Sequence, residues 1–226
     1  MREIVLDTET TGFDPLSGHR VVEIGCLELF NHMATGKEFH AYLNPEREMP
    51  SEAEAVHGLS NAFLANKPLF AAVADDMLAF IGDSPIVAHN AGFDMAFINA
   101  ELKRVGKTPL AADRAIDTVT LARRKFPGAQ ASLDALCRRF QIDTTARNKH
   151  GALLDAKLLS QVYLELIGGR EPGLALGALE AVATLEAAAE RTVRTPRPHG
   201  ATDEELTAHT TFVASLKNAI WVRAPG

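Results

Sequence analysis

Residues 2–14 read REIVLDTETTGFD, an aliphatic stretch that runs directly into two acids. Such a short apolar run is typical of a buried strand. Successive side chains of a strand point to opposite faces, so Asp7 and Glu9 share a face. At about 3.3 Å per residue they start roughly 6.6 Å apart. Two like charges this close predict that a cation lies between them.

Composition places the chain among ordinary globular proteins: 226 residues, 46% hydrophobic and 23% charged. A formal net charge of −6 argues against a broadly basic nucleic-acid binder. Cys26 and Cys137 stand in unrelated patterns, which predicts buried free thiols of a reducing compartment. The chain enters a strand at once and has no apolar run near the ~20 residues of a membrane span. We therefore expect a cytoplasmic protein with no signal peptide and no membrane contact.

Apolar periodicity and turn residues predict an α/β fold. The turn at 14–19 joins the first two strands as a hairpin. Strands that are first adjacent and later alternate with helices predict a mixed sheet flanked by helices. We expect strands at 2–9, 21–30, 37–43, 85–90 and 114–119, and helices at 51–58, 68–82, 91–106, 118–125, 131–140 and 151–167.

The C-terminal part differs from the rest. Residues 1–169 form one predicted domain, 170–201 a linker with a candidate helix at 174–191, and 202–226 a separate segment. Thr202 and Glu205 form a predicted capping box. An isolated helix of this length is marginal in water, so we expect it to pack on the protein body or on a partner. Its apolar residues recur at near-helical spacing ahead of Trp221: Leu206, Phe212, Val213, Leu216 and Ile220.

Two further stretches carry chemistry. In AHNAGFD (88–94) Asp94 falls in the first turn of a predicted helix, and in HGALLDA (150–156) Asp155 lies inside one. His150 stands five residues before Asp155, which is about 140° of helical rotation. The two side chains would diverge within one helix, so we expect His150 on the preceding loop, folded back over Asp155.

Four carboxylates from three separate segments are costly to gather without cations. Oxygen ligands favour hard ions such as Mg²⁺ or Mn²⁺ over zinc. Two such ions about 3.5–4 Å apart suit in-line attack on a phosphodiester. His150 is suited to take the proton from the attacking water, because an unperturbed histidine has a pKa of about 6.5.

Together VLDTETTG (5–12), AHNAGFD and HGALLDA resemble, in this order and spacing, the three motifs of the DEDD exonuclease superfamily in its histidine-bearing branch. Over residues 2–169 the chain resembles one family more closely, the proofreading epsilon subunits of bacterial DNA polymerase III. The stretches that carry this resemblance are VHGLS (56–60), IDTVTLARRKFPG (116–128), SLDALCRRF (132–140), HGALLDAKLLSQVYLELIGG (150–169) and the final WVRA (221–224).

The resemblance implies a ribonuclease-H-like fold with a five-stranded mixed sheet, flanking helices and a flexible C-terminal tail. It implies a 3′→5′ exonuclease that removes mismatched 3′-terminal deoxynucleotides of single-stranded or frayed DNA as nucleoside monophosphates, using two divalent cations. Asp7, Glu9 and Asp155 would be direct metal ligands, Asp94 would act through a water, and His150 would be the general base. The terminal nucleotide would contact Asp7, Glu9, Thr10, Glu52, His57 and Asp155.

The resemblance also implies partners. The C-terminal segment of the family docks on the polymerase catalytic (alpha) subunit, and 202–226 fits helix-in-groove recognition. Family members carry a glutamine-led clamp-binding motif after the catalytic domain. The corresponding GGREPGLAL (168–176) has Arg170 instead and no aromatic residue. A sliding-clamp contact would therefore be weak and depend on Leu174 and Leu176.

Other readings stand beside this one. The chain could be an RNA-processing exonuclease of the same superfamily, or a scaffolding subunit with an inactive site. Asp117 resembles a further catalytic acid, but a helix N-terminal role is expected, and His89 and Asn90 are expected to buttress the site. The basic run at 123–125 could contact phosphate or form a solvated helix face. Residues 1–169 carry 17 basic and 22 acidic side chains, which predicts no extended basic groove.

Overall fold

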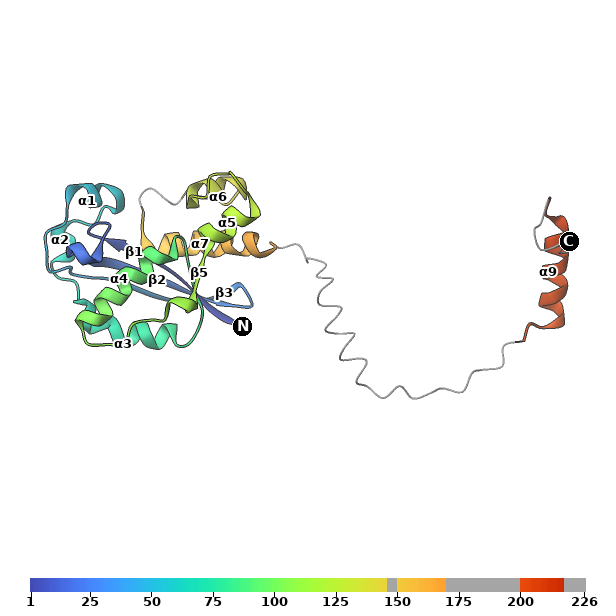
Figure 1. Ribbon diagram of the computed structural model, residues 1–226, viewed down its shortest axis with the longest axis horizontal. Coiled ribbons are helices and arrows are strands. Elements are labelled where there is room, and N and C mark those ends of the chain that lie inside the picture. The colour runs from blue at the N-terminus through green and yellow to red at the C-terminus, as the bar shows by residue number, and fades with distance from the viewer. Residues whose placement is uncertain (146–149, 170–199, 218–226) are drawn as a thin grey trace. The chain divides into compact units, whose positions relative to one another are not determined.

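The computed structural model describes residues 1–145, 150–169 and 200–217 (Figure 1). The chain divides into two units, Met1–Gly173 and Leu174–Gly226. The candidate helix at 174–191, Ile220, Trp221 and most of the predicted linker lie outside the described residues. Within the described part of the chain, no helix combines the length and the apolar character that a membrane span requires.

A five-stranded mixed sheet in the order β3-β2-β1-β4-β5 forms the centre of the first unit. Strand β2 runs antiparallel to both of its neighbours, β1 and β3, and β4 and β5 continue the sheet parallel to β1. This confirms the predicted sheet class. The strands are β1 (Arg2–Thr10), β2 (Val21–Phe30), β3 (Met33–Tyr42), β4 (Ile86–Ala88) and β5 (Ala115–Asp117).

Helices follow the predicted order with shifted ends. The helices of the first unit are α1 (Ser51–His57), α2 (Asn61–Leu64), α3 (Phe70–Ile81), α4 (Ala91–Arg104), α5 (Thr118–Lys125), α6 (Leu133–Arg139) and α7 (Ala152–Ile167). Two short 3-10 helices lie at Pro15–Ser17 and Ala112–Arg114.

Several boundaries were predicted wrongly. The helix expected from 68 begins at Phe70, because Leu69 is extended and acts as its N-cap. The strand expected to reach 90 ends at Ala88, because Asn90 takes a left-handed φ of 67° where α4 begins. Helix α2 was missed; Ser60 starts it by accepting a hydrogen bond from the Phe63 amide. Strand β3 starts at Met33 rather than at residue 37.

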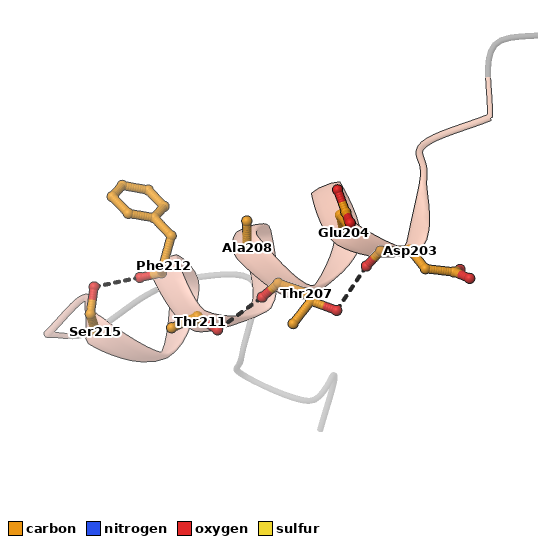
Figure 2. Close-up of a pocket in the computed structure, with 7 residues that line it drawn as sticks. All are labelled: Asp203, Glu204, Thr207, Ala208, Thr211, Phe212 and Ser215. Carbon is orange, nitrogen blue, oxygen red and sulfur yellow. Dashed lines mark hydrogen bonds between the residues drawn. The ribbon is translucent and has the colours of Figure 1, made fainter.

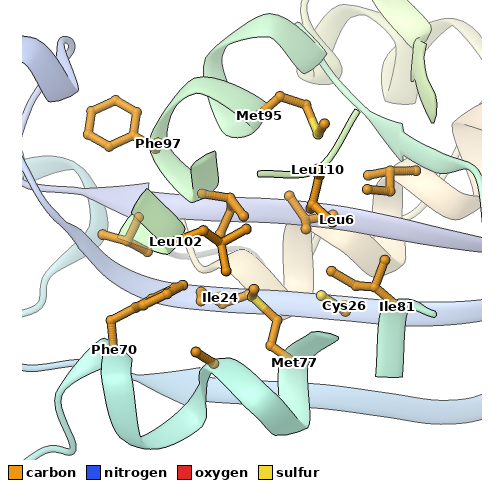
Figure 3. Packing of buried hydrophobic residues seen from close by; sticks show 14 of the residues in the cluster. Leu6, Ile24, Cys26, Phe70, Met77, Ile81, Met95, Phe97, Leu102 and Leu110 are labelled. Carbon is orange, nitrogen blue, oxygen red and sulfur yellow. The ribbon is translucent and has the colours of Figure 1, made fainter. Parts of the chain in front are cut away.

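Alternation along β1 divides the hydrophobic core between the two faces of the sheet. Leu6 packs with α3 and α4 (Figure 3), and Ile4 belongs to the same cluster, whereas Val5 packs with α5, α6 and α7. Each fully buried aliphatic side chain contributes about 1.5–3 kcal/mol. Cys26 and Cys137 are buried, as predicted, and one lies in each cluster. Even-numbered side chains of β1 therefore face α4, and odd-numbered ones face α7.

The second unit contains helix α9 (Asp203–Ser215). The predicted capping box is present: the Thr202 hydroxyl accepts a hydrogen bond from the Glu205 amide, and the Glu205 carboxylate accepts one from the Thr202 amide. The helix ends before Leu216, which is extended. Within the described residues α9 buries no side chain.

Candidate active site

The two faces of β1 recruit the two other acidic segments. Asp7 and Glu9 continue the face that packs on α7, the helix that carries Asp155. Thr8 continues the opposite face, and its hydroxyl donates a hydrogen bond of 2.7 Å to Asp94 Oδ1 on α4. The end of β1 is thus the place where carboxylates from α4 and α7 meet.

A glycine lets α7 approach the sheet. Gly25 on β2 is the register partner of Asp7. A Cβ at Gly25 would lie only 2.4 Å from the backbone of Ala152 and Leu153 in the first turn of α7. No other residue type permits this approach, which brings the buried Asp155 over the sheet.

His150 lies on the loop before α7 and folds back, as the rotation argument predicted. Its Nδ1 lies 3.1 Å from Asp155 Oδ2. The His150 side chain is 46% exposed, whereas that of Asp155 is 4% exposed. The histidine is therefore reachable by water while its carboxylate partner is held in the protein.

Side chains from other segments bind both ends of α4, and these contacts fix the position of Asp94. At the start, Asp117 Oδ1 accepts hydrogen bonds from the Asn90 amide at 3.0 Å and the Val119 amide at 3.1 Å. One carboxylate thus caps α5, as predicted, and also holds the first turn of α4. Toward the other end, the buried Glu101 forms a bidentate ion pair with Arg20, with distances of 2.6 and 2.9 Å.

His89 links two elements beside the candidate site. Its Nδ1 lies 2.9 Å from the Thr118 hydroxyl, which also donates to the Ala88 carbonyl. These contacts join the end of β4 to the start of α5, next to the helix that carries Asp94.

The raised pKa values of the clustered carboxyl groups indicate that a nearby positive charge would stabilise their ionised forms. Burial raises the pKa of Asp94 to about 7, although the hydrogen bond from Thr8 opposes the rise. Burial also raises the pKa of Asp7, and the negative charges of Asp94, Glu9, Asp155 and Glu23 raise it further. Carboxylates that are hard to ionise together are stabilised by a cation placed among them.

The donor set fits hard divalent cations. One ligand atom from each of Glu9, His150 and Asp155 lies within 4.8 Å of the others. Asp7 and Asp94 interact electrostatically beside this group. Carboxylate oxygens of this number suit Mg²⁺ or Mn²⁺, which favour oxygen ligands.

A cavity of about 460 Å³ adjoins the carboxylates. Six residues are expected to contact a terminal nucleotide. Of these, Glu9, Thr10, Glu52 and His57 line the cavity, whereas Asp7 and Asp155 are not part of its lining. His57 is the last residue of α1 and is buried, and its Nδ1 accepts a hydrogen bond from the Leu59 amide. Val56 and Phe93 contribute apolar surface to the wall.

Sequence analysis missed three residues of this region. Glu23 is buried and lies opposite Glu9 in the hairpin register, 2.7 Å from His40 Nε2. The predicted hairpin could have revealed Glu23, because pairing its strands sets the two acids across from each other. Phe93 packs against the core and also lines the cavity, and Phe13 is 91% exposed at its edge.

The sequence matches one exonuclease family model and several proteins of one name. A family model described as Exonuclease matches residues 4–163. The DNA polymerase III subunit epsilon of Rickettsia conorii is 47% identical over 222 residues, covering 96% of each chain. The protein of the same name from Escherichia coli (strain K12) is 44% identical over 220 residues, covering 92% of this chain and 90% of the relative.

Solved structures share the fold. Exonuclease X in complex with 5′ overhanging duplex DNA is 25% identical with a TM-score of 0.57, over 73% of this chain and 90% of that chain. The nuclease domain of 3′hExo, a DEDDh family member bound to rAMP, has a TM-score of 0.64 at 17% identity, over 74% of this chain and 91% of that chain. The second likeness concerns the fold alone.

Proposed function

Because this chain belongs to the exonuclease family and, within it, to the DNA polymerase III epsilon subunits, we propose that its carboxylate cluster is the hydrolytic centre of replication proofreading. The protein is a 3′→5′ exonuclease of this class. The observation that supports the assignment of the site is the meeting of Asp7, Glu9, Asp94, Asp155 and His150 at the end of β1.

Asp7, Glu9 and Asp155 would hold two divalent cations, Mg²⁺ or Mn²⁺, with Asp94 acting through a water. When bound, such ions lower the pKa of a water nucleophile and stabilise charge on the attacking and leaving oxygens. The general base is His150: its Nδ1 faces the Asp155 carboxylate, which favours a proton there and leaves Nε2 to accept the proton of the attacking water. Its exposure lets that proton pass on to solvent.

The cavity beside the carboxylates would receive the 3′-terminal nucleoside. Glu52 and His57 would contact the nucleoside from α1, and Thr10 would contact it from the end of β1. The Thr10 hydroxyl donates a hydrogen bond to the Gly12 carbonyl. Val56 and Phe93 offer apolar surface to the base without reading its identity. Selection for mismatches then follows from fraying, since an unpaired end is cheaper to extrude into a pocket.

The C-terminal segment would tether this activity to the polymerase. Figure 2 shows one face of α9, from which Phe212 projects, and Phe212 and Leu206 are 61% and 52% exposed. Apolar side chains on this helix, such as Leu206, Phe212 and Val213, could supply the anchors of helix-in-groove docking on the catalytic (alpha) subunit. Residues 170–201 would act as the linker, and tethering would raise the local concentration of the exonuclease at the primer end.

We also propose a clamp contact and a cellular location. Contact with the sliding clamp would be weak and would depend on Leu174 and Leu176. A subunit of the bacterial replication machinery works on the chromosome, so we propose a cytoplasmic location.

The test is digestion of a mispaired, labelled primer by the full chain and by Asp7→Ala, with a divalent cation or with EDTA. We expect release of nucleoside 5′-monophosphate by the wild type with cation only, and none by the variant. Full activity in EDTA or in the variant would contradict the mechanism. Matched DNA and RNA oligonucleotides separate the alternatives: strong preference for RNA would favour an RNA-processing enzyme.

A further inference from the structure

A second groove lies beside the candidate active site, away from the terminal-nucleotide cavity. It has a volume of about 550 Å³, and Asn90, Asp117, Arg123 and Gln130 are part of its lining. A neighbouring concavity shares Gln130 and includes Arg138 and Arg139 from α6. We call the surface formed by Arg123, Gln130, Arg138 and Arg139 the arginine surface.

Residues 118–140 carry a net positive charge, whereas residues 1–169 as a whole carry a net negative charge. Residues 118–140 carry five arginines and lysines against a single acid, Asp134. The remainder of 1–169 carries 12 basic and 21 acidic side chains. We predicted no extended basic groove because the numbers of basic and acidic side chains in residues 1–169 are nearly equal. These totals do not show the local positive surface at residues 118–140.

The arginines of this surface are largely uncommitted. Among the described residues Arg123 makes no hydrogen bond or ion pair. Arg139 stacks on the Phe126 ring at 4.5 Å, and Arg138 donates a single bond to the Asp134 carbonyl. Lys125 differs, since its amine donates to carbonyls at the end of α7. Exposed guanidinium groups without acidic partners match the bidentate geometry of phosphate.

The groove is also close to the reacting centre. Asn90, in its lining, is the N-cap of α4, and Asp94 follows four residues later, about 6 Å along the helix. The terminal-nucleotide cavity is built instead from the end of β1 and from α1. In Figure 1, α1 and α6 stand well apart on the first unit. A strand whose end fills the cavity can pass the carboxylates and continue over the groove.

We propose that the arginine surface binds the phosphates of the nucleotides that precede the 3′-terminal residue. The inference rests on the proposed function and adds a second binding region to the same site. Phosphate contacts carry no sequence information, so the surface holds any strand that reaches it. It thereby keeps the scissile phosphate at the carboxylates while the terminal nucleoside occupies the cavity.

The test compares Arg123→Ala/Arg139→Ala with the matched control Lys103→Ala/Arg104→Ala. The control removes the same charge from exposed positions in the last turn of α4, at the end opposite to Asn90. Two substrates are used in parallel: an oligodeoxynucleotide of about eight residues, and the nitrophenyl ester of thymidine 5′-monophosphate, which has no preceding phosphate. The measured quantity is the ratio of their kcat/KM values.

We expect the arginine variant to lower this ratio about tenfold and to reduce the salt slope of log(kcat/KM) on the oligonucleotide by about 1.4, which is about 0.7 for each lost phosphate contact. The control should match the wild type. An unchanged ratio and slope would overturn the proposal and leave a solvated helix face or an acidic protein segment as the explanation. An equal loss on both substrates would overturn it too.

The proposal fails separately from the proposed function. A wild-type protein that hydrolyses neither substrate would contradict the exonuclease site itself. Should the double variant melt at a lower temperature, Arg123→Ala alone carries the same comparison, because it removes no hydrogen bond or ion pair among the described residues.

Discussion

The Thr8 hydroxyl donates a hydrogen bond of 2.7 Å to Asp94 Oδ1, joining residues 86 positions apart in the chain. Both side chains are buried, with exposed fractions of 6% for Thr8 and 3% for Asp94. The contact orients the Asp94 carboxylate from the strand that carries Asp7 and Glu9. Hydrogen bonds of this kind aim a metal-binding carboxylate, and their loss typically costs 10- to 100-fold in metal affinity or activity.

Replacing Thr8 tests this positioning role. We expect Thr8→Val, which keeps the shape and loses the donor, to raise the Mn²⁺ concentration needed for half-maximal activity roughly tenfold. Thr8→Ser keeps the hydroxyl and should stay close to wild type. Metal titration of nuclease activity at constant pH measures both. Equal metal dependence in the two variants would show that Thr8 only fills space.

Gly25→Ala tests the close approach of α7. The new Cβ would meet the backbone of Ala152 and Leu153 at 2.4 Å, so helix and strand must separate. We expect unfolding to become easier by about 1–3 kcal/mol and activity to fall because Asp155 moves with the helix. Chemical denaturation measures the first effect. Gly92→Ala in α4 is the control: a Cβ there meets nothing within 4 Å and should be neutral or slightly stabilising. A stable, active Gly25→Ala would contradict the packing.

Asp7→Asn should stabilise the metal-free protein while abolishing activity. The folded pKa of Asp7 is raised, so its ionisation opposes folding once the pH exceeds the unfolded value of about 3.9. In EDTA we expect a gain on the order of 1 kcal/mol near pH 8 that disappears toward pH 4. Thermal melting across this pH range measures it. Asp76→Asn on the exposed face of α3 should show no such gain, and a gain that persisted at pH 4 would speak against charge repulsion.

His150→Ala should remove the proposed general base and leave the fold intact. The side chain is 46% exposed, so little buried surface is lost. We expect kcat to fall about 10²- to 10⁴-fold, with an unchanged melting temperature. Single-turnover digestion of an oligonucleotide separates this effect from binding. Wild-type rates in the variant would eliminate His150 as the base.

Deletion of residues 171–226 should separate catalysis from assembly. Both large core clusters lie entirely within the first unit, so the truncated protein should fold and keep its nuclease activity. It should no longer co-elute with the polymerase catalytic subunit in size-exclusion chromatography. Retained co-elution would refute the role proposed for α9 and its flanking residues.

Much of the secondary structure was predictable because its signals are local. The hairpin of β1 and β2, the capping box at Thr202, and the cap at Asp117 depend on residues within a few positions of one another. Helix ends were less predictable. Asn90 takes a left-handed conformation that Asp117, 27 positions later, supports by accepting from its amide. No local pattern encodes such a partner.

The sequence by itself determined that Asp7 and Glu9 share a face of a strand and that His150 must leave the helix to meet Asp155, because backbone periodicity alone sets these relations. Only the tertiary structure decided that Thr8 holds Asp94, that Gly25 admits α7, and that Glu23 adds another charge beside Asp7. That Arg123 and Arg139 line two neighbouring concavities, which share Gln130, belongs to the same group. Distances between side chains on different elements depend on how those elements pack, and packing is a property of the whole chain.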